Sequence, residues 1–545
     1  MNMEKTVKSR HRKYDAQFKE EALKQIEHGQ SVNPIRKHSN ATRDLARALK
    51  PADVYWWLLE YGYYPEAYVL PPCFRVAKMP GKQKRYFDLN KGFKGLKETE
   101  CVHVHFPKTE LTDRTFGIIE PNIHNDIAYH ITRNWKAMVD AMIPMDSIVS
   151  SYSFPVPVNR KKPGRMGELR SGRMIYEFIA MTDDALATVA YRFTHIVKAD
   201  IKNFYPSVYT HSLSWAIHGK RAIRHGGKGK NRRRDMKFVG NRLDKLFQMA
   251  NDGCTNGLPI GPAVSDIASE IVASAVDRVL TAELKKNEIE CEAVRFKDDY
   301  RILVSSEADA KKVVKILQVS LKEYNLELSD EKTTVSALPD GLFRPWVSRY
   351  HLVHPKRKNR FTWKQFRELY LAVVEIDRHH PNTGVIDRFL ADITTRKGRL
   401  KITVRTFNLE KVVSMLLMLG TLRAKAFPKI VAVLEQVIRS DDGNGLTEPL
   451  VSHLEAYLHK LSGDEARNKY LISWIGYFLA SNDLLKLLKK KPKFKDPIAN
   501  SSMTGRGKLF GDAPDFKLIE GVKAAGKRVS LFEHLDVFNP LKHAE

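Results

Sequence analysis

Apolar positions follow two different spacings in the central part of the chain. The apolar run Thr194–Ala199 predicts a strand, and residues 293–304 predict two short strands on either side of a tight turn. Residues 207–218 and 263–285 instead repeat their apolar positions at helical spacing. Strand and helix signals therefore alternate across residues 194–304, and this alternation predicts an α+β unit.

The residues before this unit are predicted to be mostly helical. Residues 14–26 predict one amphipathic helix within a polar extension that covers residues 1–50. Residues 55–64 predict a buried helix and turn, and residues 122–143 predict a single long helix.

A second helical region is predicted after residue 345. Its amphipathic segments are residues 364–377, 408–422, 426–439, 447–461 and 466–481. Serial helices of this kind predict a bundle or an irregular solenoid. Residues 486–545 begin with a lysine-dense stretch and contain several glycines, so they are interpreted as a partly ordered basic tail.

The charge balance points to a polyanionic partner. Lysine and arginine total 91 against 63 acids, a formal charge of +28. Each phosphate that a basic group neutralises releases condensed counterions, which favours binding to nucleic acid. No apolar run approaches the roughly 20 residues that span a bilayer. Met1–Lys13 has no signal-type apolar core, so a cytoplasmic protein that does not engage a membrane is expected.

Two basic segments each have two interpretations. Residues 159–173 contain Arg165, Arg170 and Arg173, and form either a solvated hairpin or a clamp for phosphate groups. Residues 219–237 contain Arg232–Arg234, and a solvated loop is slightly favoured there over contact with nucleic acid.

Three acids lie where the predicted strands end. Asp298 and Asp299 form the turn of the predicted hairpin, and Asp200 follows the strand Thr194–Ala199. Adjacent buried carboxylates are costly unless a cation binds them, and magnesium prefers oxygen ligands. Two such ions roughly 4 Å apart activate a 3′-hydroxyl and stabilise the leaving pyrophosphate during in-line displacement. These residues therefore predict a carboxylate cluster for metal-assisted phosphoryl transfer.

A glycine- and proline-containing loop, residues 256–262, precedes the helix predicted at 263–285. Glycine lets the backbone approach a base or a sugar closely. A rigid loop that merely begins the helix is the alternative interpretation.

In order along the chain, these segments resemble the palm motifs of reverse transcriptases. Asp200 with its following aromatic residues resembles the first motif, residues 256–262 the second, and Phe296–Asp299 the aromatic-x-Asp-Asp third. Tyr324–Thr333 is similar to the segment that follows the catalytic hairpin in bacterial members. The resemblance implies a right-hand polymerase of α+β fold, with fingers and a palm (an antiparallel sheet with helices) followed by an all-α C-terminal helical domain.

The same resemblance sets the expected domain boundaries. They are an N-terminal helical extension at 1–50, fingers at 51–193, palm at 194–345, helical domain at 346–485 and basic tail at 486–545.

Within that family, the chain resembles the bacterial defence-associated and abortive-infection reverse transcriptases, the so-called unknown-group class. The loop Gly257–Pro262, the segment Gly240–Asp244 and a helical region after the palm carry this resemblance. It implies antiphage defence through DNA synthesis, which in some relatives is untemplated or primed by the protein itself. The candidate priming residues are Tyr370, Tyr457, Tyr470 and Tyr477, for each of which core packing is the preferred interpretation.

The motif match implies a role for each acid. Asp200 and Asp298 are expected to be the principal ligands of two Mg²⁺ ions, with Mn²⁺ as the alternative, and Asp299 to be the companion acid. The backbone carbonyl of Ile201 is expected to complete a metal shell. Tyr205 matches the bulky residue that collides with a ribose 2′-hydroxyl, which favours deoxynucleotides; an ordinary buried aromatic is the alternative.

The nucleotide-binding residues follow from the same match. Asn256 and Gly257 are expected to line the nucleotide pocket, and Lys332 to approach the triphosphate or to be a solvated lysine at a strand edge. The three arginines of residues 159–173 are candidate phosphate ligands. Lys297 replaces the small or apolar residue more usual before the acid pair, and is expected to alter the field around the metals.

The expected partners are RNA or DNA, including a co-encoded noncoding RNA, together with deoxynucleoside triphosphates and further copies of the chain. Two alternatives stay open: an RNA-synthesising polymerase with the same palm, and a nucleic-acid-binding scaffold without catalysis.

Overall fold

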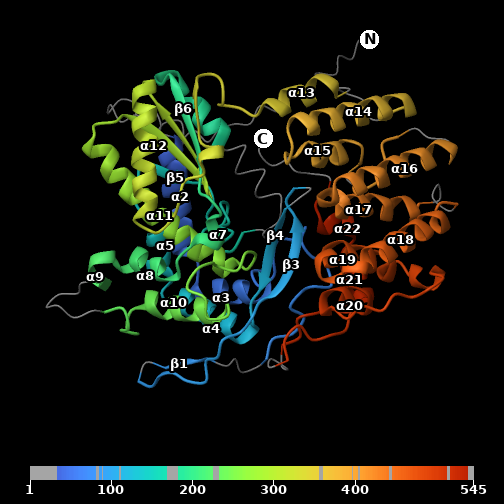
Figure 1. The fold of residues 1–545 in the computed structure, drawn as a ribbon, viewed down its shortest axis with the longest axis horizontal. Helices are drawn as coiled ribbons and strands as arrows, with labels where there is room; N and C mark the ends of the chain where they lie inside the picture. The colour runs from blue at the N-terminus through green and yellow to red at the C-terminus, as the bar shows by residue number, and fades with distance from the viewer. Residues whose placement is uncertain are drawn as a thin grey trace, which may run out of the picture.

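A five-stranded sheet carries the segments singled out above (Figure 1). The computed structural model describes residues 34–80, 85–88, 90–109, 112–167, 182–224, 232–354, 360–395, 397–402, 406–440, 445–511 and 516–537. The strands are β5 (Val149–Ser151), β6 (His195–Asp200), β7 (Cys291–Phe296), β8 (Asp299–Val304) and β9 (Thr334–Ala337). Their order is β5-β7-β8-β6-β9, and all neighbours are antiparallel except β5 and β7. The predicted strand and the predicted hairpin are therefore confirmed.

Each face of this sheet borders a different core, because successive strand residues point to opposite sides. Val197 and Ile302 belong to the large core that the sheet forms with its helices. Ile196 and Leu303 point the other way, into a smaller core. The helices that pack on the first face are α11 (Ala263–Lys286) and α12 (Glu307–Lys322). Asp200, at the end of β6, and Asp299, at the start of β8, lie on the second face beyond this smaller core.

Four helices of the N-terminal half pack around α11 and its neighbours. They are α2 (Pro34–Ala48), α3 (Pro51–Glu60), α4 (Pro121–Arg133) and α5 (Trp135–Met142). The prediction of one helix over residues 122–143 is wrong, because the chain breaks at Asn134. The amide of Asn134 donates to the carbonyl of His130 at 2.8 Å, so the side chain takes an acceptor of the helix end. The helix predicted within residues 14–26 lies outside the described residues.

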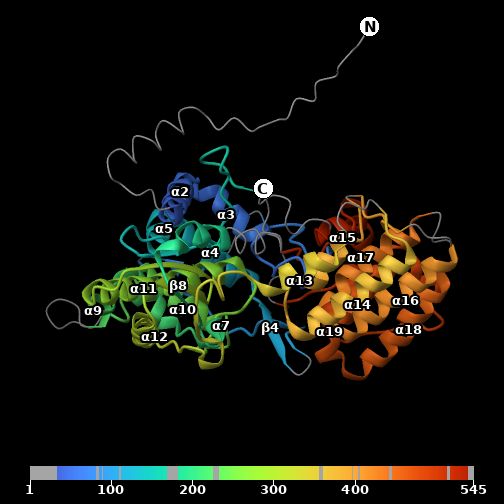
Figure 2. The same ribbon diagram turned by 90° about the horizontal axis from the view of Figure 1, so that it is seen from above.

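A long hairpin connects the sheet-bearing part to the C-terminal helices. It consists of β3 (Val102–Pro107) and β4 (Asp113–Ile118), and lies between the two parts in both views (Figures 1 and 2). A smaller hairpin, β1 (Phe87–Asp88) with β2 (Gly92–Phe93), precedes it. On one side the N–H of Gly117 donates to the carbonyl of Ile260 at 2.9 Å. On the other, the ring of Phe106 lies 5.1 Å from that of Tyr470.

Short helices fill the segment between β6 and α11. They are α7 (Phe204–Ser207), α8 (Thr210–His218), α9 (Lys220–Arg224) and α10 (Val239–Met249). The predicted helix at 207–218 is confirmed as α8. The insertion expected as a loop contains α9.

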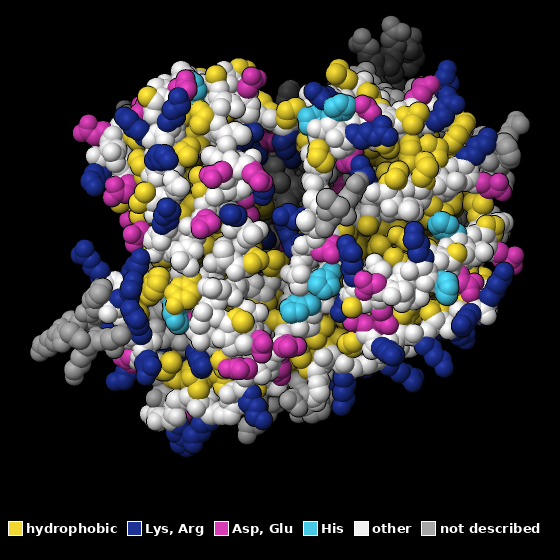
Figure 3. Space-filling view, in the orientation of Figure 1, with side chains coloured by type: hydrophobic (Ala, Val, Ile, Leu, Met, Phe, Trp, Pro, Cys, Tyr) yellow, Lys and Arg dark blue, Asp and Glu magenta, His cyan; other side chains and the backbone are white. Residues whose placement is uncertain are grey.

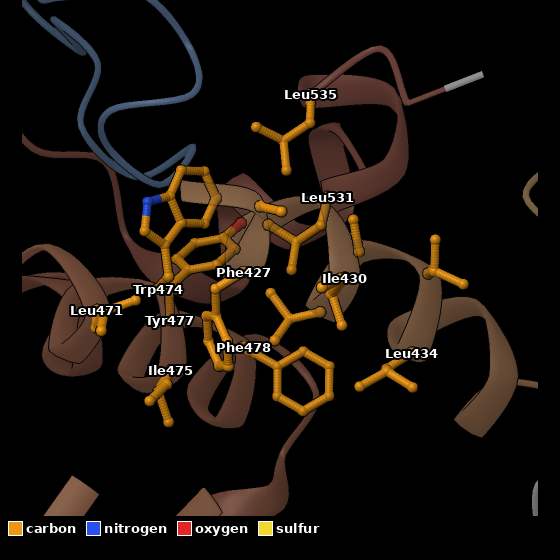
Figure 4. Close-up of a cluster of buried hydrophobic side chains, with 14 of the residues drawn as sticks. Phe427, Ile430, Leu434, Leu471, Trp474, Ile475, Tyr477, Phe478, Leu531 and Leu535 are labelled. Carbon is orange, nitrogen blue, oxygen red and sulfur yellow. The ribbon is translucent and has the colours of Figure 1, made fainter. Parts of the chain in front are cut away.

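The C-terminal region is helical, as predicted. Its helices are α13 (Pro345–Val353), α14 (Trp363–His379), α15 (Val385–Asp392), α16 (Thr406–Leu422), α17 (Phe427–Ile438), α18 (Thr447–Leu461) and α19 (Glu465–Ser481). All five predicted helices are present, whereas α13 and α15 were not predicted. Helices α17 and α19 pack together through Phe427, Ile430, Trp474 and Phe478, which are at most 1% exposed (Figure 4).

The described residues of the basic tail form short helices joined by irregular segments, which agrees with the prediction of a partly ordered extension. These helices are α20 (Pro497–Thr504), α21 (Val522–Arg528) and α22 (Leu531–His534). The N–H of Glu520 donates to the carbonyl of Cys73 at 2.8 Å, and the N–H of Leu531 donates to Glu435 at 2.9 Å. Leu531 also inserts beside α17 (Figure 4). The apolar residues of the tail lie between glycines at irregular spacing. The sequence therefore showed no helical period that would have indicated that these residues are buried.

None of the described helices combines the length and the apolar character that a bilayer crossing requires.

Candidate active site

The structure brings the three predicted acids together at the end of the sheet. Asp200 ends β6, Asp299 begins β8, and the two are paired residues in the antiparallel register. Directly opposed residues of such a pair project their side chains from the same face as neighbours. The N–H of Ile201 donates to the carbonyl of Asp298 at 3.0 Å, which fastens the hairpin turn to the end of β6.

A buried arginine fixes the turn that carries Asp298. Lys297 lies in the left-handed region with φ of 55°, which a non-glycine residue rarely adopts without local support. Its carbonyl accepts a hydrogen bond from Nη1 of Arg295 at 2.9 Å. Its N–H donates to Oγ of Ser153 at 3.0 Å. The turn is therefore held on both sides of Lys297 by groups that lie inside the fold.

The same arginine is the centre of a buried charge network. Arg295 is 0% exposed, and Nη2 lies 2.8 Å from both Oε1 of Glu270 and Oδ2 of Asp277. One guanidinium faces two carboxylates, so one negative charge is not balanced by a cation. Hydroxyl groups donate hydrogen bonds to these carboxylates and stabilise that charge. Ser153 donates to Glu270 at 2.8 Å. Tyr300 donates to Asp277 at 2.7 Å. A buried ion pair is stable when its remaining polar atoms are satisfied in this way.

Two of the three acids have raised pKa values. Burial raises the pKa of Asp298 and the charge of Asp200 raises it further, against smaller lowering effects that include Lys297 and Arg114. Desolvation by the surrounding protein raises the pKa of Asp299 to about 6, although part of its side chain reaches solvent. Arg301 opposes that shift, whereas Asp298 and Asp200 add to it. The site therefore concentrates negative charge that its own cations do not fully offset.

Lys332 supplies the nearest positive charge to Asp200. Its Nζ lies 2.9 Å from both carboxylate oxygens of that residue. Within the described ranges, no group of three or more acidic, histidine or cysteine side chains is arranged to hold an ion. The acids still fit a hard divalent cation, because carboxylate oxygens are its preferred ligands and a cation would lower the raised pKa values. The ammonium of Lys332 provides a positive charge beside Asp200.

Tyr205 lies beside this cluster. Its hydroxyl donates to Asp266 on α11, and Nζ of Lys297 lies 5.9 Å from its ring centre. The same ammonium lies 3.8 Å from Oδ1 of Asp266. Lys297 and Tyr205 therefore meet at the first turn of α11, next to the hairpin turn that carries the acids.

The glycine- and proline-containing loop packs against the residues that follow Asp200. The N–H of Gly257 donates to the carbonyl of Val208 and that of Leu258 to the carbonyl of Tyr205, both at 2.9 Å. Gly257 has a φ of 96°, so a side chain there would be strained. Asn256 is exposed and bridges to Tyr209. Asn256 and Gly257 thus lie close to Tyr205, as a shared nucleotide pocket requires.

The segment after the hairpin also reaches Asp200. The N–H of Ser329 donates to the carbonyl of Asp200, and that of Lys202 donates to the carbonyl of Glu327, both at 2.8 Å. All four sequence motifs consequently converge on the end of β6.

The basic hairpin before the sheet lies elsewhere. Residues 158 and 166 pair, Arg160 contacts His38 at 3.2 Å, and Gly164 faces the carbonyl of Ala48, so this hairpin packs beside α2. Arg165 is exposed on it, and its role as a phosphate ligand stays a prediction. Arg170 and Arg173 lie outside the described residues.

The tyrosines considered for priming are core residues. Tyr370, Tyr470 and Tyr477 are at most 2% exposed, and Tyr457 is partly buried against the same core.

A hollow lies between the two parts of the molecule, and basic side chains are visible in it (Figure 3). Sequence reasoning missed one cation that acts on the acids. Arg114 on β4 acts electrostatically on Asp298. It also acts on Lys425, which follows α16, and burial is the main cause that lowers the pKa of that lysine. No local motif marks Arg114, because only the long hairpin brings it to a place where it acts on Asp298.

Comparison with known proteins agrees with this arrangement. Residues 165–363 match the family described as reverse transcriptase (RNA-dependent DNA polymerase). The match spans β6, the glycine- and proline-containing loop, the acidic hairpin and Lys332, so the chain contains a polymerase domain of the reverse transcriptase type. No curated protein matches the chain.

Solved telomerase structures are similar to the chain at a distance. Apo telomerase from Candida tropicalis, truncated from its C-terminal domain, is 15% identical over 45% of this chain and 51% of its own, with a TM-score of 0.28. Telomerase from Candida albicans in complex with a fragment of telomeric RNA is 13% identical over 59% and 54%, with a TM-score of 0.24. The chain spans about half the length of these two structures. A further apo telomerase structure from Candida tropicalis is 13% identical over 70% and 69%, with a TM-score of 0.32.

The raised pKa of Asp299 predicts how stability depends on pH without divalent metal. The pKa of Asp299 is about 6 in the folded protein, above its value in the unfolded chain. Protonation of Asp299 therefore contributes fully to folding stability below about pH 4, and this contribution is lost as pH rises through 6. In EDTA at pH 7.5, Asp299→Asn should therefore stabilise the protein by roughly 1 kcal/mol, a value reduced because solvent screens the exposed part of the side chain. Thermal unfolding at pH 7.5 and pH 4.5 should show this gain only at the higher pH. Asp184→Asn, an exposed acid, is the control, and a loss of stability at pH 7.5 would contradict the prediction.

The buried network predicts a large effect at Arg295. Arg295→Met leaves Glu270 and Asp277 without a cation, and should lower the free energy of unfolding by about 3–5 kcal/mol. Arg295→Lys retains the charge but loses the forked geometry, so an intermediate loss is expected. Urea unfolding measures both variants. Lys311→Met, which breaks an exposed pair with Glu307, should cost less than about 1 kcal/mol. Equal losses for the Lys311 and Arg295 variants would show that the network does not support the turn.

Proposed function

We propose that the protein is a DNA polymerase of the reverse transcriptase type, in which Asp200, Asp298 and Asp299 are the catalytic acids. The observation that carries the proposal is the register that opposes Asp200 to Asp299, with the carbonyl of Asp298 bonded to the next residue of β6. Raised pKa values at two of the acids support a site that awaits positive charge.

The acids are proposed to hold two Mg²⁺ ions, or Mn²⁺ in their place. Bound there, such ions would lower the pKa of a primer 3′-hydroxyl and neutralise the leaving pyrophosphate. The carboxylates of Asp200 and Asp298 would be the principal ligands, with Asp299 as the companion acid and the carbonyl of Ile201 as a further oxygen donor. Lys332, now bonded to Asp200, would release that carboxylate and turn its ammonium toward the triphosphate.

Selection of the sugar is proposed to depend on Tyr205. Its bond to Asp266 fixes the ring beside the acids, where it would meet the 2′-hydroxyl of a ribonucleotide. Asn256 and Gly257 would form the neighbouring wall, with the glycine allowing close approach of the backbone. A deoxynucleotide would fit this space without a collision, which favours DNA over RNA as the product.

A role in antiphage defence is proposed from the resemblance carried by Gly257–Pro262 and Gly240–Asp244. The division into fingers at 51–193, palm at 194–345 and a helical region from 346 belongs to the same proposal. Whether synthesis copies an RNA, proceeds without template or begins on the protein is decided by supplying labelled deoxynucleotides and magnesium to the purified protein. Sequencing of the bound RNA and of the product, with and without protease treatment, separates these three modes.

Loss of one acid tests the enzyme assignment. Asp298→Asn removes a metal ligand and should reduce DNA synthesis by at least about a hundredfold, because the charge that holds the ions is lost. Affinity for RNA should change little, since the long-range attraction comes from the basic surface. Synthesis with labelled dNTPs and fluorescence anisotropy with labelled RNA measure the two effects. Asp184→Asn is the matched control. Unchanged synthesis with weakened RNA binding would instead support the scaffold alternative.

Two substitutions at Tyr205 separate its bulk from its hydrogen bond. Tyr205→Ala should admit ribonucleotides and lower the preference for dNTPs by an order of magnitude or more, because the steric barrier is removed. Tyr205→Phe keeps the ring and should retain most of the preference. The ratio of kcat/KM for dNTP and rNTP is the measurement. A parent enzyme that already prefers rNTPs would favour the RNA-synthesising alternative.

A further inference from the structure

The insertion between α8 and α10 carries a dense basic surface that the acids do not explain. Its described residues, 219–224 and 232–238, include seven lysines and arginines and one acid, Asp235. We name this surface the basic arm. Helix α9 of the arm lies at the opposite end of the molecule from the C-terminal helices (Figures 1 and 2). The arm therefore presents its charge outside the hollow that contains the acids.

The base of the basic arm is fixed by the first turn of α10. Nδ2 of Asn241 donates to the carbonyls of Arg232 and Asp235 at 2.9 and 2.8 Å. Nη1 of Arg242 donates to the carbonyls of Met236 and Lys237 at 2.7 and 3.1 Å. Buried side chains thus hold four carbonyl acceptors of the arm, three of them successive, which gives the segment Gly240–Asp244 a structural purpose. A merely solvated loop has no need of such a base.

Aromatic rings order several of the basic side chains. Nζ of Lys220 and the guanidinium of Arg224 lie 5.3 and 5.5 Å from the ring centre of Trp215. The guanidinium of Arg232 lies 5.7 Å from the ring centre of Phe238. Cations held over rings lose less side-chain freedom when they bind an anion, so the surface is partly prepared for phosphate groups.

Other cations of the arm remain open to solvent. Arg221, Arg234 and Lys237 are exposed, and no acid within the described part of the chain forms an ion pair with any of them. Lys220 differs, because its Nζ bonds Glu323 at 2.8 Å. Arginine predominates in the arm, and its planar guanidinium binds phosphate oxygens in pairs and also stacks on bases. This chemistry fits a single-stranded nucleic acid better than an acidic protein surface.

We infer that the basic arm is a second nucleic-acid site, which binds the backbone of single-stranded RNA outside the catalytic cleft. The assignment to RNA rests on the proposed function as a polymerase of the reverse transcriptase type. The assignment of a phosphate-binding site does not depend on that function. The arm would hold the strand without reading its sequence, because phosphate contacts position a nucleic acid and do not specify bases. Its effect is to raise affinity for long RNA while leaving the acids unchanged.

The test neutralises the arm and measures binding without nucleotides, so that the result does not depend on polymerase activity. The full-length triple variant Arg221→Gln, Arg234→Gln and Lys237→Gln is compared with the parent protein by fluorescence anisotropy on a labelled single-stranded RNA. Three lost phosphate contacts should weaken binding on the order of tenfold at moderate salt. They should also make the slope of log K against log salt shallower by about 2. The charge-matched control is Lys491→Gln, Lys493→Gln and Lys495→Gln, which removes three exposed lysines elsewhere.

Each outcome decides the inference. A clear loss for the arm variant with little change in the control supports a local site. Equal losses for both variants would mean that only total charge matters, and would overturn it. The same measurement is made with a single-stranded DNA of the same sequence. Weakened DNA binding with unchanged RNA binding would overturn the assignment to RNA. Failure of Asp298→Asn to abolish synthesis would affect the proposed function alone, since the binding measurement stands apart from it.

Discussion

The repulsion between carboxylates at the end of the sheet is the constraint on which the structure depends. Asp200 opposes Asp299 across two strands, and Asp298 follows a residue in a left-handed conformation. Such an arrangement persists only if other groups determine it. The buried guanidinium of Arg295 does so, because it binds two acids of α11 and the carbonyl of Lys297 together. Neutral hydroxyls of Ser153 and Tyr300 complete that network, so the charge of Arg295 is balanced within it and does not neutralise the three acids at the end of the sheet.

A second consequence is that the halves of the molecule meet around one hairpin. The base of β3 and β4 is bonded to the glycine- and proline-containing loop, and the ring of Phe106 packs on α19. This hairpin carries Arg114 to a place where it acts on both Asp298 and Lys425. The tail then returns to residues 64–78 and adds a further connection between the C-terminal helices and the N-terminal half. Positive charge from two distant parts of the chain, at Arg114 and Lys332, consequently acts on the acids.

Charge is used in two ways in this fold. Near the acids, cations such as Lys332 and Arg114 act on particular carboxylates at short range. On the basic arm, cations are held over aromatic rings or left exposed above a rigid base, and their action is additive and sensitive to salt. The cations near the acids change the charge balance at the site of the proposed reaction. The cations of the basic arm raise the local concentration of a long polyanion. A chain with a formal charge of +28 thereby accommodates an acidic centre.

The sequence by itself predicted strand β6, the hairpin of β7 and β8, helices α8 and α11, the five main C-terminal helices and the acids, because periodicity and strand-end motifs are local properties. It also indicated that Asp200 belongs with the hairpin, both from the position of the acids at strand ends and from the resemblance to the palm motifs. Tertiary structure alone decided the pairing of Lys332 with Asp200, the buried charge network around Arg295, the approach of Arg114 to Asp298 and the folding of the tail. These depend on which residues far apart in the chain become neighbours. No short-range pattern encodes that choice, since burial and charge pairing are settled only when the elements pack.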